Sequence, residues 1–469
     1  MNYYGHMIPR INGDDIEREF SSHRDLVKKG IAGFILFGGE RENVRNHLRL
    51  LQNEVPHPLI ICSDLEQGLG QQLRGGTVFP PAMALSAAVA RDDRFDRELA
   101  HEIFSVYAEE ALSAGINTIL APVVDINTNP ENPIISVRSF GEDRETVTRM
   151  SAVMIDAFRS HSVKSCAKHF PGHGDTMVDS HISLPLLNKS LDTLEQEELY
   201  PFRRALEEGA DSIMLAHLSV PALDPEGVPL SLSGKAVQYI RQRMGFQGLL
   251  MTDALNMGGL SDIGENEAGF KSLTAGVDVL LHPGDPEGLN AYLMKRNPKS
   301  DLHRIEAFRS NLSKGKAALP DFEKNRRLAE KIAELCITVP ESIRIGKPSS
   351  IIILRERDEF SFGIFEEFLR ERYPDVRQII LKGEGIPGAN ETGENAFILI
   401  YSKTAAWKGG VSPWFREAIR GIEKRTALFI VFGNPYVVRD TKSSKVLTYW
   451  CSEQAERALV KSLEKFLFV

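Results

Sequence analysis

The densest group of reactive side chains lies between Lys168 and His181, in the stretch KHFPGHGDTMVDSH. This stretch contains three histidines, two aspartates and a lysine, and it directly follows a short apolar run. Two glycines and a proline interrupt regular secondary structure, which predicts a loop. A loop of this composition buries little and is costly to order, so a functional role explains it better than a structural one.

Asp179 and His181 are two residues apart in this loop. A carboxylate at that spacing can accept the imidazole N–H and fix its tautomer. An imidazole held in this way can protonate a leaving oxygen and later remove a proton from water. Lys168 and His169, at the end of the preceding apolar run, can donate hydrogen bonds to sugar hydroxyls.

Asp253 is a second candidate for chemistry because it ends the apolar run Gly248–Thr252. Glycoside hydrolysis needs a carboxylate at the anomeric carbon and a proton donor on the other side of the bond. Asp64 and Arg74, in the stretch SDLEQGLGQQLR, form a candidate charged clamp for a polar ligand. Arg138 lies in a loop rich in Asn and Pro and is a further candidate contact.

Some of these residues also have structural interpretations. Asp is common at a strand-to-helix turn, so Asp253 alone would be taken as the cap of the following helix. The nearby candidate pair Asp179 and His181 favours the functional interpretation instead. For Asp125, a structural role within its loop is expected.

A metal site is another interpretation of the histidines, but the sequence does not favour it. No HExxH spacing is present among them, and Lys168 beside His169 would repel a cation. The sequence therefore predicts neither a bound metal nor a cofactor. The histidines considered as ligands are His169, His173, His181 and His217.

Eight short apolar runs alternate with amphipathic stretches such as Arg94–Ala114 and Leu191–Glu208 in the first 300 residues or so. Strands alternating with helices predict a parallel sheet, and eight of them predict a (β/α)8 TIM barrel. Polar residues follow several of the runs, as expected for a site at the carboxyl ends of barrel strands. The predicted strands are Met7–Ile11, Gly33–Phe37, Leu59–Ser63, Asn117–Ala121, Lys164–Lys168, Ser212–Ala216, Gly248–Thr252 and Val277–Leu281.

The rest of the chain predicts a second, smaller α/β sandwich domain. Residues Ala307–Leu335 have the pattern of a helix, and Pro340–Pro348 that of a linker. We expect a TIM-barrel catalytic domain at 1–338 and a C-terminal α/β sandwich domain at 349–469. The strands expected there are Ser350–Leu354, Val376–Leu381, Ala396–Tyr401, Ala427–Phe432 and Lys445–Tyr449, with helices at Phe365–Arg372, Pro413–Glu423 and Glu453–Phe466.

Composition limits the classes of partner. The net charge of −8 leaves no basic surplus to neutralise phosphates, which argues against nucleic acid or an anionic membrane. The first residues lack the features of a secretory signal, and no stretch approaches the roughly 18 apolar residues of a membrane helix. The four cysteines are scattered and include no CxxC, so a reducing, cytoplasmic location is expected.

The stretches KHFPGHGDT…DSH, DLEQG and TDALNM resemble glycoside hydrolase family 3, in particular its bacterial β-N-acetylglucosaminidase (NagZ-like) branch. The resemblance covers most of residues 1–335. It implies that Asp253 is the nucleophile of a retaining mechanism with a covalent intermediate, and that His181, paired with Asp179, is the acid/base. It also implies that Asp64, Arg74, Arg138, Lys168 and His169 bind N-acetylglucosamine.

This resemblance implies removal of the non-reducing terminal N-acetylglucosamine from peptidoglycan-derived muropeptides, so the expected partner is a small glycan. A phosphorylase of the same family is an alternative, because a histidine acid/base does not repel phosphate as a carboxylate would. A catalytically inactive sugar-binding protein and a metal-dependent barrel hydrolase are the other hypotheses. The family's β-glucosidases take a glutamate acid/base from a later domain, and no counterpart is found here.

Overall fold

The computed structural model describes residues 2–91, 94–312, 318–340, 346–381, 395–403 and 410–466. These residues form two compact units. The first comprises Met1–Val78, Arg97–Asn129 and Ser139–Arg326, and the second comprises Phe79–Asp96, Pro130–Arg138 and Arg327–Val469. The division of the chain into domains at 1–338 and 349–469 stays a prediction.

The first unit is built on parallel strands that follow the eight predicted runs. Seven of them form one sheet in the order β10-β9-β8-β7-β4-β3-β2. A bridge between Met251 and Val279 continues this sheet to β11, which pairs with β1. The strands are β1 Met7–Ile8, β2 Arg10–Asn12, β3 Gly33–Phe37, β4 Ile60–Ser63, β7 Thr118–Ile119, β8 Lys164–Phe170, β9 Ser212–Leu215, β10 Leu249–Thr252 and β11 Leu280–Leu281.

Pro9 divides the first predicted strand into β1 and β2, which pair with different neighbours. Strand β1 pairs with β11, whereas β2 pairs with β3. The ring of strands therefore closes at this point, and the predicted barrel class is confirmed. Its interior is filled by side chains that alternate along the strands, including Ile8, Ile35 and Cys62.

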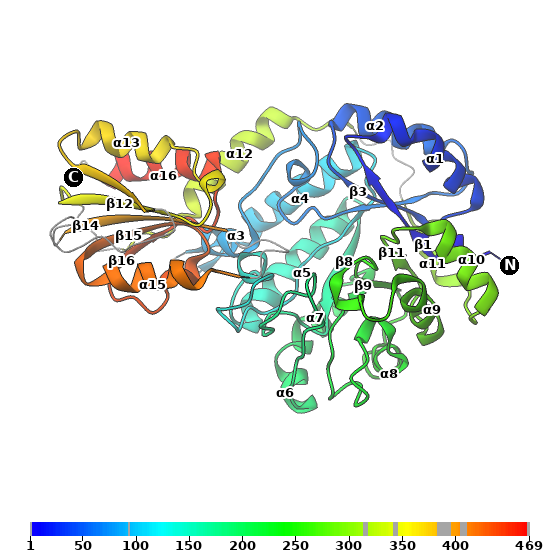
Figure 1. The fold of residues 1–469 in the computed structure, drawn as a ribbon. Helices are drawn as coiled ribbons and strands as arrows, with labels where there is room; N and C mark the ends of the chain where they lie inside the picture. The colour runs from blue at the N-terminus through cyan, green and yellow to red at the C-terminus, as the bar shows by residue number, and fades with distance from the viewer. Residues whose placement is uncertain are drawn as a thin grey trace. The chain divides into compact units, whose positions relative to one another are not determined.

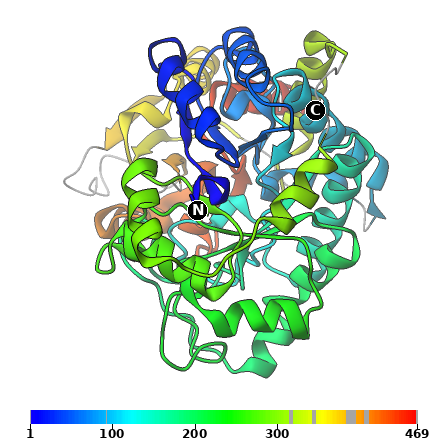
Figure 2. The same cartoon turned by 90° about the vertical axis from the view of Figure 1, so that its right-hand side faces the viewer.

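Helices follow most of the strands and lie around the sheet, with the N-terminal ones in blue and the later ones in green (Figures 1 and 2). Their boundaries reflect local sequence; for example, the Asp143 carboxylate accepts the Thr146 N–H at the start of α5. The helices are α1 Ile16–Lys29, α2 Arg41–Gln52, α4 Arg97–Ser113, α5 Arg144–Ser160, α6 Leu191–Gln196, α7 Leu199–Glu207, α8 Gly234–Gln238, α9 Glu265–Ala275, α10 Pro286–Arg296 and α11 His303–Ser310.

Two of the predicted helices are wrong in extent. The stretch Leu191–Glu208 is divided into α6 and α7, because Pro201 lacks the N–H that a continuous helix would bond to the Glu197 carbonyl. The stretch Ala307–Leu335 is also not one helix: α11 ends at Ser310, and α12 Phe322–Leu335 begins just after Pro320. Proline disfavours helical conformation in the residue before it, which explains the second break.

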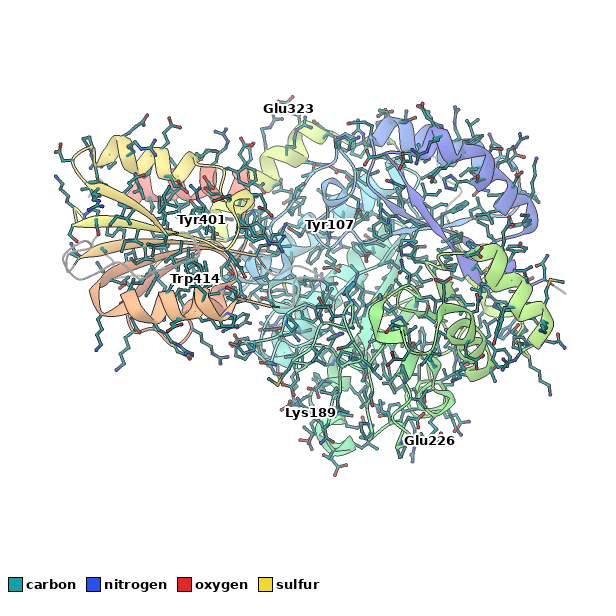
Figure 3. All side chains as sticks on the ribbon, viewed as in Figure 1. Tyr107, Lys189, Glu226, Glu323, Tyr401 and Trp414 are labelled. Atoms are coloured by element: carbon teal, nitrogen blue, oxygen red, sulfur yellow. The ribbon has the colours of Figure 1, made fainter. Side chains whose placement is uncertain are left out.

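The second unit contains a five-stranded parallel sheet in the order β13-β12-β14-β15-β16. Helices α13 Ile364–Arg372 and α16 Glu453–Phe466 lie on one face of it and α15 Pro413–Ile422 on the other (Figure 1). Tyr401 of β14, labelled in Figure 3, is buried. The predicted α/β sandwich is confirmed, with strands β12 Ser350–Arg355, β13 Arg377–Leu381, β14 Ala396–Ser402, β15 Thr426–Gly433 and β16 Ser444–Leu447.

The short helix α3 Ala82–Val89 and the hairpin β5 Ala90–Arg91 and β6 Arg94–Phe95 also belong to the second unit. Most of the predicted linker at 340–348 lies outside the described residues. No helix among the residues that the structure describes is both long enough and apolar enough to span a membrane.

Candidate active site

The strand register brings three predicted site residues to one end of the barrel. Cys62, Cys166 and Met251 point into the barrel core. Side chains alternate along a strand, so the residues two positions further on point inward at the carboxyl ends of the strands. Those residues are Asp64, Lys168 and Asp253. They therefore share the mouth of the barrel, where the loops of this fold carry their sites.

Asp253 is held in position by the backbone around it. Its N–H donates to the Leu215 carbonyl (2.9 Å), and its Oδ1 accepts the Ala254 N–H (2.8 Å). Burial opposes ionisation, but His169, His217 and the Ala254 N–H outweigh it, so the pKa of Asp253 is lowered. Asp253 is thus ionised over the whole neutral range, as a nucleophile must be.

Asp179 and His181 form the pair that their spacing predicts. The Asp179 carboxylate lies 2.8 Å from His181 Nδ1 and also accepts the His181 backbone N–H (2.9 Å). The carboxylate is fully buried, whereas 22% of the His181 side chain is exposed. A proton on Nδ1 is shared with Asp179, which leaves Nε2 to exchange a proton with a ligand.

The loop that carries this pair is fixed from within by His173. His173 Nδ1 lies 2.7 Å from Thr176 Oγ1, and its Nε2 lies 3.0 Å from Ser180 Oγ. Burial lowers the pKa of His173 to about 4, so the ring is neutral near pH 7. His173 therefore stabilises the loop through these two hydrogen bonds.

Other parts of the first unit hold the same loop from outside. Asn129 Nδ2 donates to the Thr176 carbonyl (3.2 Å). Lys189, labelled in Figure 3, lies 3.2 Å from Asp175 and also pairs with Glu198. The Gly259 N–H donates to the Ser180 carbonyl (2.9 Å). These contacts link the loop to the segment after Asp253 and bring the candidate acid/base and nucleophile to the same region.

Lys168 is buried and binds two carboxylates. Its Nζ lies 2.6 Å from Asp64 Oδ1 and 2.8 Å from Glu66 Oε1. The Asp64 side chain remains 27% exposed, so it is the member of this cluster that is open to a ligand. A carboxylate polarised by an ammonium is suited to accept hydrogen bonds from sugar hydroxyls.

His169 is oriented by Asp125, a fully buried carboxylate. Asp125 Oδ2 lies 2.7 Å from His169 Nδ1, and Oδ1 accepts the N–H groups of His169 (3.1 Å) and His173 (2.7 Å). Desolvation raises the pKa of Asp125, but His169, His173 and these hydrogen bonds lower it more, so the carboxylate stays ionised. The predicted structural role of Asp125 thus extends to fixing the tautomer of His169.

Arg74 forms ion pairs with carboxylates other than Asp64, and Arg138 lies in the other unit of the chain. Arg74 pairs with Glu40 (2.5 Å) and Asp14 (2.7 Å), whereas its predicted clamp partner Asp64 pairs with Lys168. Arg138 belongs to the second unit, where its guanidinium donates to the Ile134 carbonyl (3.2 Å). Their roles as substrate contacts stay predictions.

His217, considered as a metal ligand in the sequence, instead supports the candidate nucleophile Asp253. Its Nδ1 lies 2.7 Å from Ser231 Oγ, and its Nε2 donates to the Ala254 carbonyl (3.0 Å). Both ring nitrogens are used, and burial lowers the pKa of His217. It therefore holds the turn after Asp253. Its place after strand β9 was the signal available in the sequence.

The arrangement provides an ionised carboxylate, a carboxylate-bound imidazole and a hydrogen-bonding cluster at one barrel mouth. Within the described part of the chain, no group of three or more His, Cys, Asp or Glu side chains is arranged to hold a metal ion. His173 and His217 instead use both ring nitrogens in hydrogen bonds to protein groups, and His169 and His181 each bind a carboxylate through Nδ1. These groups suit acid–base and nucleophilic chemistry on a polar substrate.

Comparisons with known proteins agree with this chemistry. Residues 15–323 match the family model described as the glycosyl hydrolase family 3 N terminal domain. A relative called β-hexosaminidase A, from Pseudoalteromonas piscicida, is 34% identical over 314 residues. The match covers 61% of this chain and spans half the length of that relative.

Solved structures of similar fold cover both units. A family 3 β-N-acetylglucosaminidase from Paenibacillus sp. superposes with a TM-score of 0.79 at 26% identity, covering 98% of this chain and 95% of that one. NagZ from Neisseria gonorrhoeae, in complex with N-trifluoroacetyl-D-glucosamine, gives a TM-score of 0.60 at 26% identity. That match covers 70% of this chain and 97% of NagZ.

Proposed function

Because the chain belongs to glycosyl hydrolase family 3, we propose that it is a retaining exo-β-N-acetylglucosaminidase. Its proposed substrates are peptidoglycan-derived muropeptides, from which it removes the non-reducing terminal N-acetylglucosamine. The observation that carries the proposal is the Asp179–His181 pair, held on a loop that is bonded to the segment after Asp253. The names of the β-hexosaminidase and β-N-acetylglucosaminidase relatives support the same activity.

In the first step, Asp253 attacks the anomeric carbon while protonated His181 donates its Nε2 proton to the glycosidic oxygen. The bond from the anomeric carbon to that oxygen breaks, the alcohol leaves, and a glycosyl-Asp253 ester forms. Asp179 stabilises the imidazolium before the transfer and keeps the Nδ1 proton in place.

In the second step, neutral His181 accepts a proton from water at Nε2 while the water oxygen attacks the anomeric carbon. The ester bond breaks, Asp253 is regenerated as a carboxylate, and His181 is again an imidazolium. Two displacements at one carbon retain its configuration. Because His181 is neutral when the acceptor arrives, phosphate replacing water is the outcome to be tested beside hydrolysis.

Asp64, Lys168 and His169 are the proposed contacts of the terminal sugar, together with Arg74 and Arg138. The partly exposed Asp64 carboxylate and the oriented His169 ring support this role. The 2-acylamino sugar bound to the gonococcal NagZ supports a 2-acetamido substrate. All four cysteines are free thiols, which supports a reducing compartment such as the cytoplasm.

Hydrolysis of para-nitrophenyl β-N-acetylglucosaminide, compared with the β-glucoside, tests the proposal for wild type, Asp253→Ala and His181→Ala. We expect wild type to prefer the acetamido sugar and both variants to lose most of the activity. NMR of the first product formed should show the β anomer. A preference for glucoside, or full activity in Asp253→Ala, would contradict the proposal, and a sugar 1-phosphate formed in added phosphate would identify a phosphorylase.

A further inference from the structure

Phe37 occupies the same inward position of β3 as Asp64 does of β4, and Arg10 of β2 lies opposite Ile35 of β3. Ile8 and Ile35 point into the barrel core, and Cys62 of β4 does the same. Arg10 lies two residues beyond Ile8, and Phe37 lies two residues beyond Ile35. The alternation that brings Asp64 to the barrel mouth therefore brings Phe37 there too, and Arg10, which pairs with Ile35, points inward on the same side.

Arg10 is placed over the ring of Phe37. Its guanidinium carbon lies 5.0 Å from the centre of that ring. The Arg10 side chain is exposed, and within the described part of the chain no carboxylate lies at ion-pair distance from it. A cation stacked on an aromatic ring keeps its hydrogen-bonding edge open to a ligand.

His282 completes this group from the end of β11. Its ring centre lies 5.8 Å from that of Phe37, and its backbone N–H donates to the Ile8 carbonyl (2.8 Å). Its φ of +52° is rare for a residue with a side chain, and such conformations concentrate at functional sites. The turn that follows is held by Glu265, whose carboxylate accepts the N–H groups of Gly284 and Asp285.

Charge at this side of the mouth favours an anionic ligand. Burial and the Arg10 charge lower the pKa of His282 to about 4, so His282 is neutral near pH 7 and offers uncharged hydrogen bonds. Lys168 is already paired with Asp64 and Glu66. Arg10 thus contributes a positive charge that, among the described residues, forms no ion pair with a carboxylate, beside an aromatic ring suited to packing on a sugar face.

We propose that Arg10, stacked on Phe37 beside His282, forms a subsite that binds a carboxylate or phosphate carried by the substrate of the barrel-mouth site. This inference rests on the proposed glycosidase function and specifies its substrate as anionic. A guanidinium binds either anion through two parallel hydrogen bonds. The anion has two possible sources: a phosphate on the terminal sugar, or the free lactyl carboxylate of a linked N-acetylmuramic acid that carries no peptide.

The test compares matched neutral and anionic substrates by kcat/KM. One pair is the disaccharide of N-acetylglucosamine with N-acetylglucosamine or with N-acetylmuramic acid. The other is para-nitrophenyl N-acetylglucosaminide with or without a 6-phosphate. Wild type should prefer the anionic member of one pair, and the pair that shows the preference identifies the source.

Arg10→Met keeps an apolar stem over Phe37 and removes the charge. We expect it to reduce the anionic preference by about 10- to 100-fold, the range for a charged hydrogen-bonded contact. Arg10→Lys should retain part of the preference. The matched control is Arg49→Met, which changes an exposed arginine of α2 outside the proposed subsite and should keep the preference of wild type.

The subsite would be overturned if wild type showed no preference in either pair. It would also be overturned if Arg10→Met lowered kcat/KM for the neutral and the anionic substrate in equal proportion. Loss of the preference in Arg49→Met as well would show a general charge effect and would also overturn it. Circular dichroism of each variant checks that it folds. If wild type cleaves none of the acetamido sugars, the proposed function itself fails, which is a different result.

Discussion

At the scale of single residues, the site uses the same pair of groups twice. Asp125 binds Nδ1 of His169, and Asp179 binds Nδ1 of His181. The two pairs differ in exposure: the His169 side chain is 8% exposed and that of His181 is 22% exposed. We assign the buried pair to holding the sugar and the open pair to proton transfer, because a proton donor must reach both the leaving group and water.

Asp125→Asn should weaken both folding and substrate binding. Three N–H groups converge on the Asp125 carboxylate, whereas an amide has one acceptor oxygen and brings two hydrogens of its own. A buried donor left without a partner costs about 1–3 kcal/mol of stability. We expect this loss in urea unfolding, with a rise in KM as His169 loses its orientation.

The matched control is Asp262→Asn, which changes an exposed aspartate of the same unit. We expect its free energy of unfolding in urea and its KM to equal those of wild type. Unchanged stability and KM in Asp125→Asn would show that the buried carboxylate does not orient His169.

Burial of His173 should make stability depend on pH. The pKa of its imidazole is about 4 in the folded chain, below the ordinary value of 6.5. Between these values the unfolded chain binds a proton that the folded chain does not, so stability falls as the pH drops from 6.5 to 4. The free energy of unfolding that is lost through His173 approaches about 3 kcal/mol at the acidic end of this range.

Urea unfolding of wild type and His173→Gln across this pH range measures the effect. We expect the variant to be less stable at pH 7, because it loses a tie to Thr176 or Ser180. It should also show a shallower fall in stability toward pH 4. If the free energy of unfolding fell equally with pH in the two proteins, the pH dependence would not come from His173.

At the scale of elements, the loop of residues 172–183 depends on two glycines for close approach. A Cβ on Gly174 would lie 1.7 Å from the Ile126 carbonyl oxygen, and one on Gly258 would lie 2.4 Å from that of His181. Both distances are far inside van der Waals contact, so any side chain there displaces backbone. The loop is therefore positioned by the segments that bear these residues as much as by its own sequence.

Gly258→Ala should move His181, the proposed acid/base, away from its position without changing a reactive group. A displacement of about 1 Å can cost on the order of 10²-fold in rate. We expect kcat for the para-nitrophenyl substrate to fall by about 10- to 100-fold, with a smaller change in KM. Gly234→Ala is the control, because an added Cβ there meets no atom closer than 4.0 Å; equal kcat values for the two variants would contradict this account.

The helices and strands were largely predictable from the sequence, whereas the contacts between residues of different strands were not. Apolar runs such as Gly33–Phe37 have the length and composition of buried strands, and the structure places β3 at those residues. The Asp125–His169 pair was not predictable, because these residues are 44 positions apart and meet only through the pairing of neighbouring strands. The breaks near Pro201 and Pro320 were visible in the sequence but were outweighed by helical periodicity.

At the scale of the whole molecule, the second unit is assembled from three separate stretches of chain. Phe79–Asp96 and Pro130–Arg138 pack with Arg327–Val469, although in the sequence they lie between strands of the barrel. Within this unit, Arg416 forms an ion pair with Glu131, and the Tyr436 hydroxyl lies 4.0 Å from the Met83 sulfur. A linear pattern of apolar runs carries no signal for such interleaving, since it requires long-range packing.

This interleaving predicts that the chain is not divisible at the linker. A protein ending at Thr338 would keep Phe79–Asp96 and Pro130–Arg138 but lose the residues they pack against, including Arg416 and Tyr436. The buried apolar side chains of α3, such as Leu85 and Val89, would then be exposed to water. We expect a melting temperature several degrees lower and a tendency to aggregate, because newly exposed apolar surface favours both.

The same truncation should raise KM if Arg138 binds the sugar, because the segment Pro130–Arg138 would lose its packing partners. Full-length Arg138→Met separates the two effects, since it removes the guanidinium while keeping the second unit intact. A matching rise in KM for both proteins would assign the defect of the truncated chain to Arg138. A truncated chain with the melting temperature and KM of the full-length protein would show instead that residues 1–338 fold and bind substrate on their own.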